Sequence, residues 1–206
     1  MFFNTNFYVC PYCYEKISNY VACKRCIEQL KNLINVKTGS TKDCCRFTAP
    51  FVYKDIVRDA ILTFKFEKKI EYCKSFCYFI EACNKYLADI LVYVPNYEEK
   101  FNSSKEIAKI LKRKLKIKLQ KNAIVKIKKT KCQHKCSIKE RYSNLNGAFI
   151  ADEKKVRGKT VLICDDIITT ASTIQEMAYA LKKSGALKVF GIAFAISENS
   201  KNYNLI

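Results

Sequence analysis

The sequence predicts an α/β fold with a parallel sheet, preceded by a small cysteine-rich module. Three observations lead to this prediction. From about residue 46 onward, apolar segments of strand length alternate with longer segments of helical periodicity. The length of 206 residues suits one full domain with a small appendage. The first 32 residues hold two Cys-x-x-Cys pairs and few candidates for an apolar core, so we expect a module at 1–32 and a main domain at 33–206.

The first half of the main domain is expected to be mixed structure. Residues 46–53 have the composition of an extended segment, whereas 57–66 and 71–90 carry helical spacing. Residues 90–95 form an apolar run that predicts a buried strand, and Pro95 ends it. This half therefore contributes two helices between two extended segments.

A helix and a strand are expected next. Ser103 followed by Glu106 matches a capping box. The helix that starts there has apolar residues repeating every four positions, at Ile107, Leu111, Leu115 and Leu119. Residues 122–127 predict another strand, and 137–148 a polar loop with a short helix.

The last part of the chain predicts strand, loop, helix and strand. An apolar strand at 159–166 ends in two acids, a polar loop follows at 169–173, and the helix at 174–186 stops at Ser184-Gly185. Residues 187–196 predict the final strand. Alternating strands and helices favour a parallel sheet with right-handed connections.

The composition is that of a folded, strongly basic protein. Lys and Arg number 38 against 19 for Asp and Glu, a formal net charge of +19, which favours an anionic partner such as nucleic acid or a phosphorylated small molecule. Hydrophobic residues make up 49%, which excludes disorder throughout. The start of the chain lacks the layout of a signal peptide, and the longest apolar stretches are too short for a bilayer. We therefore expect a cytoplasmic protein without membrane insertion.

The two cysteine pairs predict a structural zinc site. Cys10, Cys13, Cys23 and Cys26 have the spacing of a zinc knuckle, and four thiolates leave no open position for chemistry. The alternative is a set of buried or redox-active thiols. Among the other cysteines, Cys73, Cys77, Cys83 and Cys164 suit core packing, and a second metal site at Cys132, His134 and Cys136 is the less favoured interpretation.

The segment after the strand at 159–166 predicts a ribose 5-phosphate site. Ligands bind outside the carboxyl ends of parallel strands, where Asp165 and Asp166 emerge, and the acids suit a divalent metal or ribose hydroxyls. The following loop offers hydroxyls and amides at a helix start, which suits a phosphate, through Thr169, Thr170, Ala171, Ser172 and Thr173. The alternative is an Asp/Thr-rich turn that only caps a helix.

This loop resembles the phosphoribosyl pyrophosphate (PRPP) loop of type I phosphoribosyltransferases, and nearly the whole chain resembles the ComF (ComFC) family of competence-associated proteins. Apart from the cysteine knuckle and the acidic loop, the resemblance rests on the stretch 53–66, Val94-Pro95, Thr130, Gln133, Arg141, Asn144 and Gly147-Ala148-Phe149. It implies a Rossmann-like type I phosphoribosyltransferase domain that binds PRPP with Mg²⁺, a zinc-bearing amino-terminal module and a role in moving incoming single-stranded DNA during natural transformation. Other DNA-uptake proteins are then expected as partners.

Within this resemblance, Asp165 and Asp166 are the candidate catalytic residues and hold the ribose hydroxyls, directly or through Mg²⁺. The loop 169–173 binds the 5-phosphate, and Lys65 is a candidate for the pyrophosphate. The chain departs from the family pattern at Ala171, where most type I enzymes have Gly, and at 99–103, where an Arg and a Gln are replaced. Gln133, Arg141 and Asn144 are expected either to shape the neighbouring loop or to pack.

A basic run lies between residues 100 and 131, with thirteen Lys or Arg and a single acid, Glu106. Such a run attracts a polyanion with salt-dependent affinity, or it is merely a solvated face. Three functions stay open: a transferase that uses PRPP, a nucleobase-salvage phosphoribosyltransferase, and a non-catalytic PRPP-sensing module that binds DNA.

Overall fold

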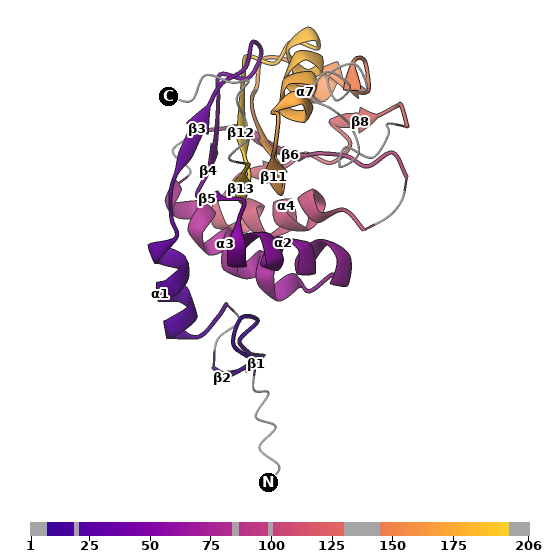
Figure 1. Cartoon of the computed structure of the whole chain (residues 1–206). Coiled ribbons are helices and arrows are strands. Elements are labelled where there is room, and N and C mark those ends of the chain that lie inside the picture. The colour runs from indigo at the N-terminus through magenta and orange to yellow at the C-terminus, as the bar shows by residue number, and fades with distance from the viewer. Residues whose placement is uncertain (1–7, 19–20, 84–86, 99–100, 130–144, 198–206) are drawn as a thin grey trace.

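The computed structural model describes residues 8–18, 21–83, 87–98, 101–129 and 145–197. A sheet forms the middle layer, with α2, α3 and α4 on one face and α7 on the other (Figure 1). The amino-terminal module lies beyond the three-helix layer, at the bottom of the view. The predicted α/β architecture is confirmed.

The central sheet has six strands in the order β3-β4-β12-β10-β6-β7. Their bounds are Lys37–Gly39, Arg46–Ala49, Lys188–Ile192, Thr160–Cys164, Ile90–Tyr93 and Lys118–Leu119. All neighbours pair in parallel except the antiparallel pair β3 and β4. The parallel sheet expected from the sequence is therefore confirmed, with one antiparallel edge.

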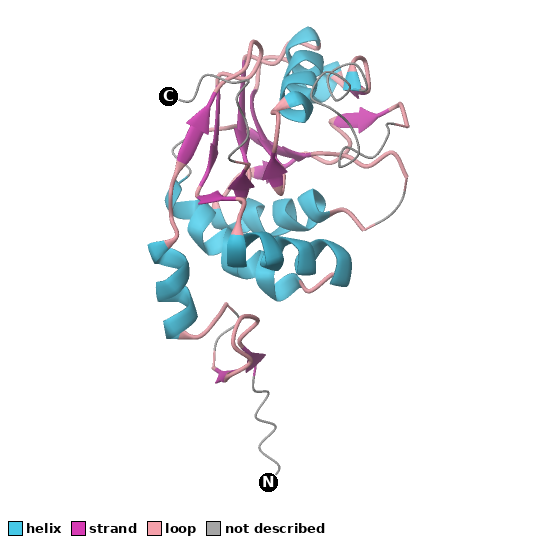
Figure 2. Cartoon of the chain, viewed as in Figure 1, coloured by secondary structure: helices cyan, strands magenta, loops and turns pink. Residues whose placement is uncertain are grey.

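Three central strands bend and continue in a smaller parallel sheet, in the order β11-β13-β5. Its strands are Ile167–Ile168, Ala195–Ile196 and Phe51–Val52, which follow β10, β12 and β4 along the chain (Figure 2). The single strands predicted at 46–53 and 187–196 are thus each split. Pro50, which lacks an amide donor, marks the break in the first. In the second, the amides of Phe194 and Ala195 both donate to the carbonyl oxygen of Asp166.

The two faces of the sheet belong to different core clusters because side chains alternate along a strand. Val161 and Ile163 of β10 pack in the cluster that includes α7, whereas Leu162 and Cys164 pack in the cluster that includes α2, α3 and α4. Strand β10 is buried on both sides, which explains its continuous apolar sequence. The buried position of Cys164 agrees with the core role expected for it.

Two of the helices end earlier than their sequence patterns predict. The four longest in the main domain are α2, α3, α4 and α7, at Asp55–Glu67, Ile70–Cys83, Ser103–Lys114 and Ser172–Lys183. The helix predicted over 71–90 ends at Cys83, well before β6. Helix α4 is capped by Leu115, after which Lys116 has φ 54° and the chain enters β7 with Leu119. Leu119 therefore extends the sheet rather than the helix.

A small two-stranded sheet lies beside the main one. It pairs β8 (Ile124–Lys126) with β9 (Phe149–Ala151) in an antiparallel ladder, followed by the short helix α6 (Glu153–Val156). The strand predicted at 122–127 is confirmed in β8. No helix among the described residues is long and apolar enough to cross a bilayer.

The amino-terminal module docks on α3. It consists of β1 (Tyr8–Val9), β2 (Lys16–Ile17) and α1 (Lys24–Asn32). The Tyr72 hydroxyl donates to the carbonyl of Pro11 at 2.5 Å, and Ser75 donates to that of Val21 at 2.7 Å. Helix α1 also contributes Leu30 to the core of the main domain. The boundary at residue 32 stays a prediction.

Candidate functional site

The two acids lie at the bend between the sheets. Asp165 follows the last residue of β10, and its amide donates to the carbonyl of Ile192 at 2.9 Å, which extends the ladder by one step. Asp166 is fixed through its carbonyl, which accepts the two amides of the break in the neighbouring strand. Both carboxylates therefore emerge from backbone that two strands hold in place.

Asp165 is partly buried and accepts two hydrogen bonds on the same oxygen. Its Oδ1 receives the Ser104 hydroxyl and the amide of Asp166, each at 2.9 Å. Burial, followed by the charge of Asp166, raises its pKa to about 7, although Lys65 opposes the shift. Among the described residues, no hydrogen-bond partner is recorded for Oδ2. Asp165 thus presents one oxygen to a ligand.

Asp166 is buried and already paired. The ammonium of Lys65 lies 3.0 Å from Oδ2 and 3.2 Å from Oδ1, and the Ser103 hydroxyl donates to Oδ2. Burial, the largest single cause, would lower the pKa of Lys65, but the charge and hydrogen bond of Asp166 together with the charge of Asp165 outweigh it and raise the pKa above its usual value. The two acids therefore differ, because Asp165 has an open oxygen and both oxygens of Asp166 are engaged.

Sequence patterns did not predict that the hydroxyls of two serines donate to the acids. Asn102, not Ser103, caps α4, since its side chain accepts the amide of Lys105 at 2.8 Å. This shifts the predicted helix start by one residue and leaves Ser103 and Ser104 facing the acids. The available signal was topological: the segment after β6 must emerge beside the end of β10, because the two strands are parallel neighbours.

The loop after the acids offers a mixture of partly buried and buried hydroxyls. Thr169 and Thr173 line a cavity in front of the acids. Thr170 and Ser172 are buried, and their hydroxyls lie 2.8 Å apart in a mutual hydrogen bond. The loop leads into α7, whose first amides have no intrahelical partner and point toward the loop. A phosphate bound here would contact the first amides of α7 and the hydroxyls of Thr169 and Thr173.

Ala171 adopts the left-handed conformation, with φ 53° and ψ 6°. This region costs a residue with a side chain on the order of 1 kcal/mol relative to Gly. The departure from the glycine of type I enzymes therefore falls at a position whose backbone favours glycine.

The cavity measures about 270 Å³ and brings together most of the predicted site. Asp165, Asp166 and Lys65 line it, together with Lys126 of β8 and Phe149 of β9 from the small two-stranded sheet. Burial lowers the pKa of Lys126. The predicted contributors Thr130, Gln133, Arg141 and Asn144, and the less favoured metal site at Cys132, His134 and Cys136, lie outside the described residues.

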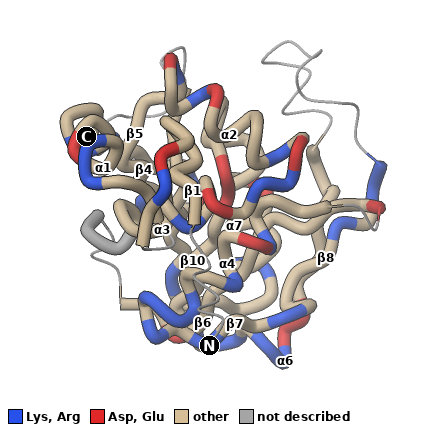
Figure 3. The backbone as a smooth tube through the Cα atoms, turned by 90° about the horizontal axis from the view of Figure 1, so that it is seen from below, with Lys and Arg blue, Asp and Glu red and all other residues tan. Residues whose placement is uncertain are grey.

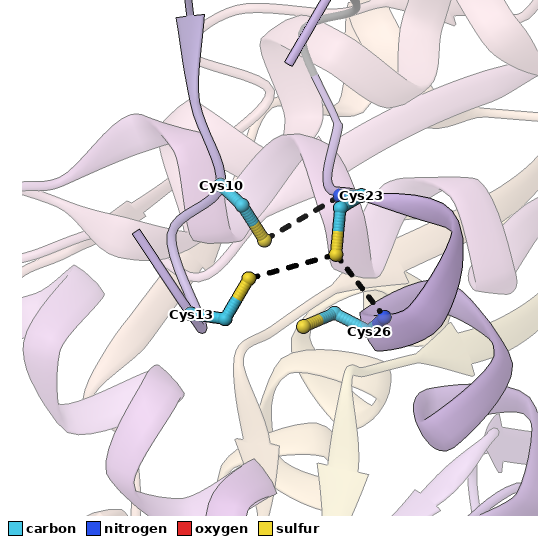
Figure 4. A group of neighbouring side chains, drawn as sticks. All are labelled: Cys10, Cys13, Cys23 and Cys26. Atoms are coloured by element: carbon cyan, nitrogen blue, oxygen red, sulfur yellow. Dashed lines mark hydrogen bonds between the residues drawn. The ribbon is translucent and has the colours of Figure 1, made fainter. Parts of the chain in front are cut away.

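The four cysteines of the module gather as the spacing predicts (Figure 4). All four Sγ atoms lie within 4.8 Å of one another, and the sulfurs of Cys13 and Cys23 are 3.6 Å apart. Tetrahedral zinc with bonds of 2.3 Å places its sulfurs ~3.8 Å apart, so the arrangement fits that ion. The amides of Cys23 and Cys26 each donate to a sulfur at 3.4 Å. Although burial opposes ionisation of Cys10, hydrogen bonds from the amides of Cys23, Tyr12 and Cys13 lower its pKa to about 7.

The cavity also fits a hard divalent cation. Mg²⁺ is usually bound through one or two carboxylates together with substrate phosphates. The accessible Oδ2 of Asp165 meets the first requirement, and the loop before α7 supplies a place for the second.

Comparisons with known proteins match this arrangement. A family model described as "Phosphoribosyl transferase domain" covers residues 102–205, from the cap of α4 through the acids and the loop. "DNA utilization protein YhgH" of Escherichia coli (strain K12) is 34% identical over 108 residues, which are 50% of this chain and 47% of that protein. "Competence protein F" of Haemophilus influenzae is 30% identical over 118 residues, or 53% and 52% of the two chains. The chain thus spans about half the length of these curated relatives.

The two relatives confirm the resemblance to the ComF family. Among solved structures, the glutamine PRPP amidotransferase from B. subtilis is 20% identical, with a TM-score of 0.43, over 58% of this chain and 25% of that one. This last similarity is too weak to support any conclusion about function.

Proposed function

We propose that this chain, which belongs to the phosphoribosyl transferase domain family, binds PRPP with Mg²⁺ in the cavity at the end of β10 and engages single-stranded DNA through the basic end of α4. One observation carries the first part. The two acids, the loop before α7 and two lysines meet around a single cavity of about 270 Å³, although they come from distant parts of the sequence.

The parts of PRPP have matching partners in this cavity. The ribose hydroxyls, or the Mg²⁺ that binds them, are assigned to Asp165 and Asp166. The 5-phosphate is assigned to the loop 169–173, where the start of α7 favours negative charge. The pyrophosphate is assigned to Lys65, and Lys126 supplies a second ammonium in the lining of the cavity. Mg²⁺, when bound, neutralises negative charge between the acids and the phosphates.

Calorimetric titration of PRPP, with and without Mg²⁺, tests this assignment. We expect binding that needs Mg²⁺ and is lost in Asp165→Asn, which keeps the Oδ1 acceptor but removes the charge. Asp152→Asn is the matched control, because Asp152 caps α6 away from the cavity. No binding to the native protein, or equal binding in Asp165→Asn, contradicts the proposal.

The DNA-binding part of the proposal rests on charge and on one aromatic side chain. Lys and Arg gather around β6 and β7, near the carboxyl end of α4 (Figure 3). The run contains Lys109, Lys112, Arg113, Lys116 and Lys118, all exposed. On the adjacent helix α3, Tyr78 is 45% exposed, and the ammonium of Lys114 lies 5.7 Å from its ring centre. An exposed ring beside cations suits a single strand, whose bases stack while its phosphates meet lysines.

Fluorescence anisotropy with labelled oligo-dT tests the role of Tyr78. Loss of one stacking platform is worth about 1 to 3 kcal/mol, so Tyr78→Ala should weaken binding by at least about fivefold. Tyr179→Ala is the control, because Tyr179 is 48% exposed but lies on α7, on the opposite face of the sheet. Equal effects of the two substitutions, or binding that does not weaken with salt, would refute this contact surface.

We further propose that the cysteine cluster binds one structural Zn²⁺ through Cys10, Cys13, Cys23 and Cys26. The closed set of four thiolates supplies a core for a module with few buried residues and leaves no position for substrate. Reduced thiol ligands suit the cytoplasm. There, in keeping with the names of the two relatives, the protein would handle incoming single strands together with other DNA-uptake proteins.

A further inference from the structure

We propose that Lys65 is an exchangeable cation: it neutralises Asp166 in the ligand-free cavity and transfers to the pyrophosphate of a bound ligand, which frees Asp166. This inference rests on the proposed function and deepens it. It makes Lys65 the residue that couples the anionic and the ribose-binding halves of the cavity. Lys65 acts here as a positioning residue for Asp166.

Lys65 and Ser103 close off the carboxylate of Asp166. The Lys65 ammonium lies within 3.2 Å of both carboxylate oxygens, and one of these oxygens also accepts the Ser103 hydroxyl. The side chain of Asp166 is 7% exposed. A metal ion or a ribose hydroxyl can reach both oxygens of Asp166 only after Lys65 has moved.

The cavity gives the side chain of Lys65 space into which it can move. Its side chain is 26% exposed and lines the cavity, whereas the carboxylate it holds is fixed by the bend in the sheet. It starts from the carboxyl-terminal turn of α2, a different element from either acid. The mobile partner of the pair is therefore the lysine.

Charge decides when the exchange is favourable. A divalent cation on Asp166 repels the ammonium beside it, and a partly buried ammonium that leaves its carboxylate needs another anion. Pyrophosphate supplies that anion, whereas the metal alone does not. We therefore expect metal and pyrophosphate to favour each other's binding, and the metal alone to bind weakly.

The test compares two variants that remove the same charge from the same cavity. Mn²⁺ alone is titrated into zinc-loaded protein, and free Mn²⁺ is followed by electron paramagnetic resonance. Lys65→Met should bind Mn²⁺ at least about tenfold more tightly than the native protein, because a like charge within 4–6 Å shifts cation binding by that order. Lys126→Met, whose ammonium is 6.0 Å from the centre of the Phe149 ring, should raise the affinity by less than threefold. The double variant with Lys65→Met and Asp166→Asn should lose the increase in Mn²⁺ affinity that Lys65→Met alone produces.

Equal gains in the two lysine variants, or no gain in Lys65→Met, overturn the exchange. If thermal melting shows that Lys65→Met does not fold, Lys65→Gln provides the same comparison, since its amide still donates to Asp166 without charge. Titration of PRPP with Mn²⁺ into the native protein separates the two proposals. Failure to bind PRPP overturns the proposed function together with the exchange, whereas PRPP binding with unchanged Mn²⁺ affinities overturns the exchange alone.

Discussion

Replacing Asp165 by Asn is expected to stabilise the ligand-free protein above neutral pH. The native carboxyl has its pKa raised from 3.8 to about 7, first by burial and then by the charge of Asp166. Its ionisation at neutral pH therefore works against folding. An Asn side chain keeps an oxygen for the Ser104 hydroxyl and for the amide of Asp166. Only the unfavourable charge is lost.

The size and sign of the effect follow from proton linkage. The folded chain holds the Asp165 proton more tightly than the unfolded chain does, so its contribution to stability is fully present below pH ~4 and is lost as the pH rises to about 7. Raising this pKa from 3.8 to about 7 changes the free energy of unfolding by about 4 kcal/mol as an upper bound. Because Asp165 lines a cavity where solvent screens its charge, we expect Asp165→Asn to raise the free energy of unfolding by about 2 kcal/mol at pH 8.

Urea unfolding of the native protein and Asp165→Asn at pH 5 and pH 8, without divalent ions in the cavity, measures this difference. The variant should be more stable at pH 8, and its advantage should shrink at pH 5. Asp166→Asn is the contrasting variant, since it leaves the half-buried Lys65 without its carboxylate and should cost about 3 kcal/mol at pH 8. A destabilised Asp165→Asn at pH 8, or an advantage independent of pH, would refute the reasoning.

Three further outcomes are expected elsewhere in the molecule. The purified protein should contain one zinc per chain, and chelation should lower its melting temperature, whereas an unchanged melt would speak against a structural ion. Gly191→Ala should cost about 1 to 3 kcal/mol in chemical unfolding, because the new methyl would lie 2.9 Å from Cβ of Phe47 on the neighbouring strand β4; an unchanged midpoint would mean that the paired strands β12 and β4 accommodate the methyl without cost. Tyr72→Phe should destabilise by about 1 kcal/mol through the lost bond to Pro11, whereas Tyr12→Phe should be neutral or stabilising, because its buried hydroxyl has no partner among the described residues. Equal losses in the two variants would contradict this account of the docking contact.

Local patterns predicted the features that depend on local spacing. The doubled Cys-x-x-Cys motif predicted four sulfurs around one point, because each short loop turns its two thiols in the same direction. The apolar run of β10 predicted a strand buried on both faces, with its acids at the carboxyl end. Both features need only a few neighbouring residues.

The remaining features depend on contacts between distant segments. The periodic Leu119 suggested more helix, but pairing with β6 draws it into the sheet. The breaks at Pro50 and before Ala195 lie side by side in the folded chain, which no single segment reveals. Ser103 and Ser104 face the acids only because β6 and β10 are neighbours. The pairing of Lys65 with Asp166 spans 101 positions of sequence.

The twelve residues of α4 connect the two ends of the proposed activity. Its first turn holds the serines that contact the acids, and its last turn holds Lys114 beside Tyr78. At a rise of 1.5 Å per residue, the two ends are about 18 Å apart on one stiff rod. A ligand that tilts this helix at the serine end also displaces its lysine end, so a phosphorylated sugar and a nucleic acid strand could bind together only in a single orientation of the helix.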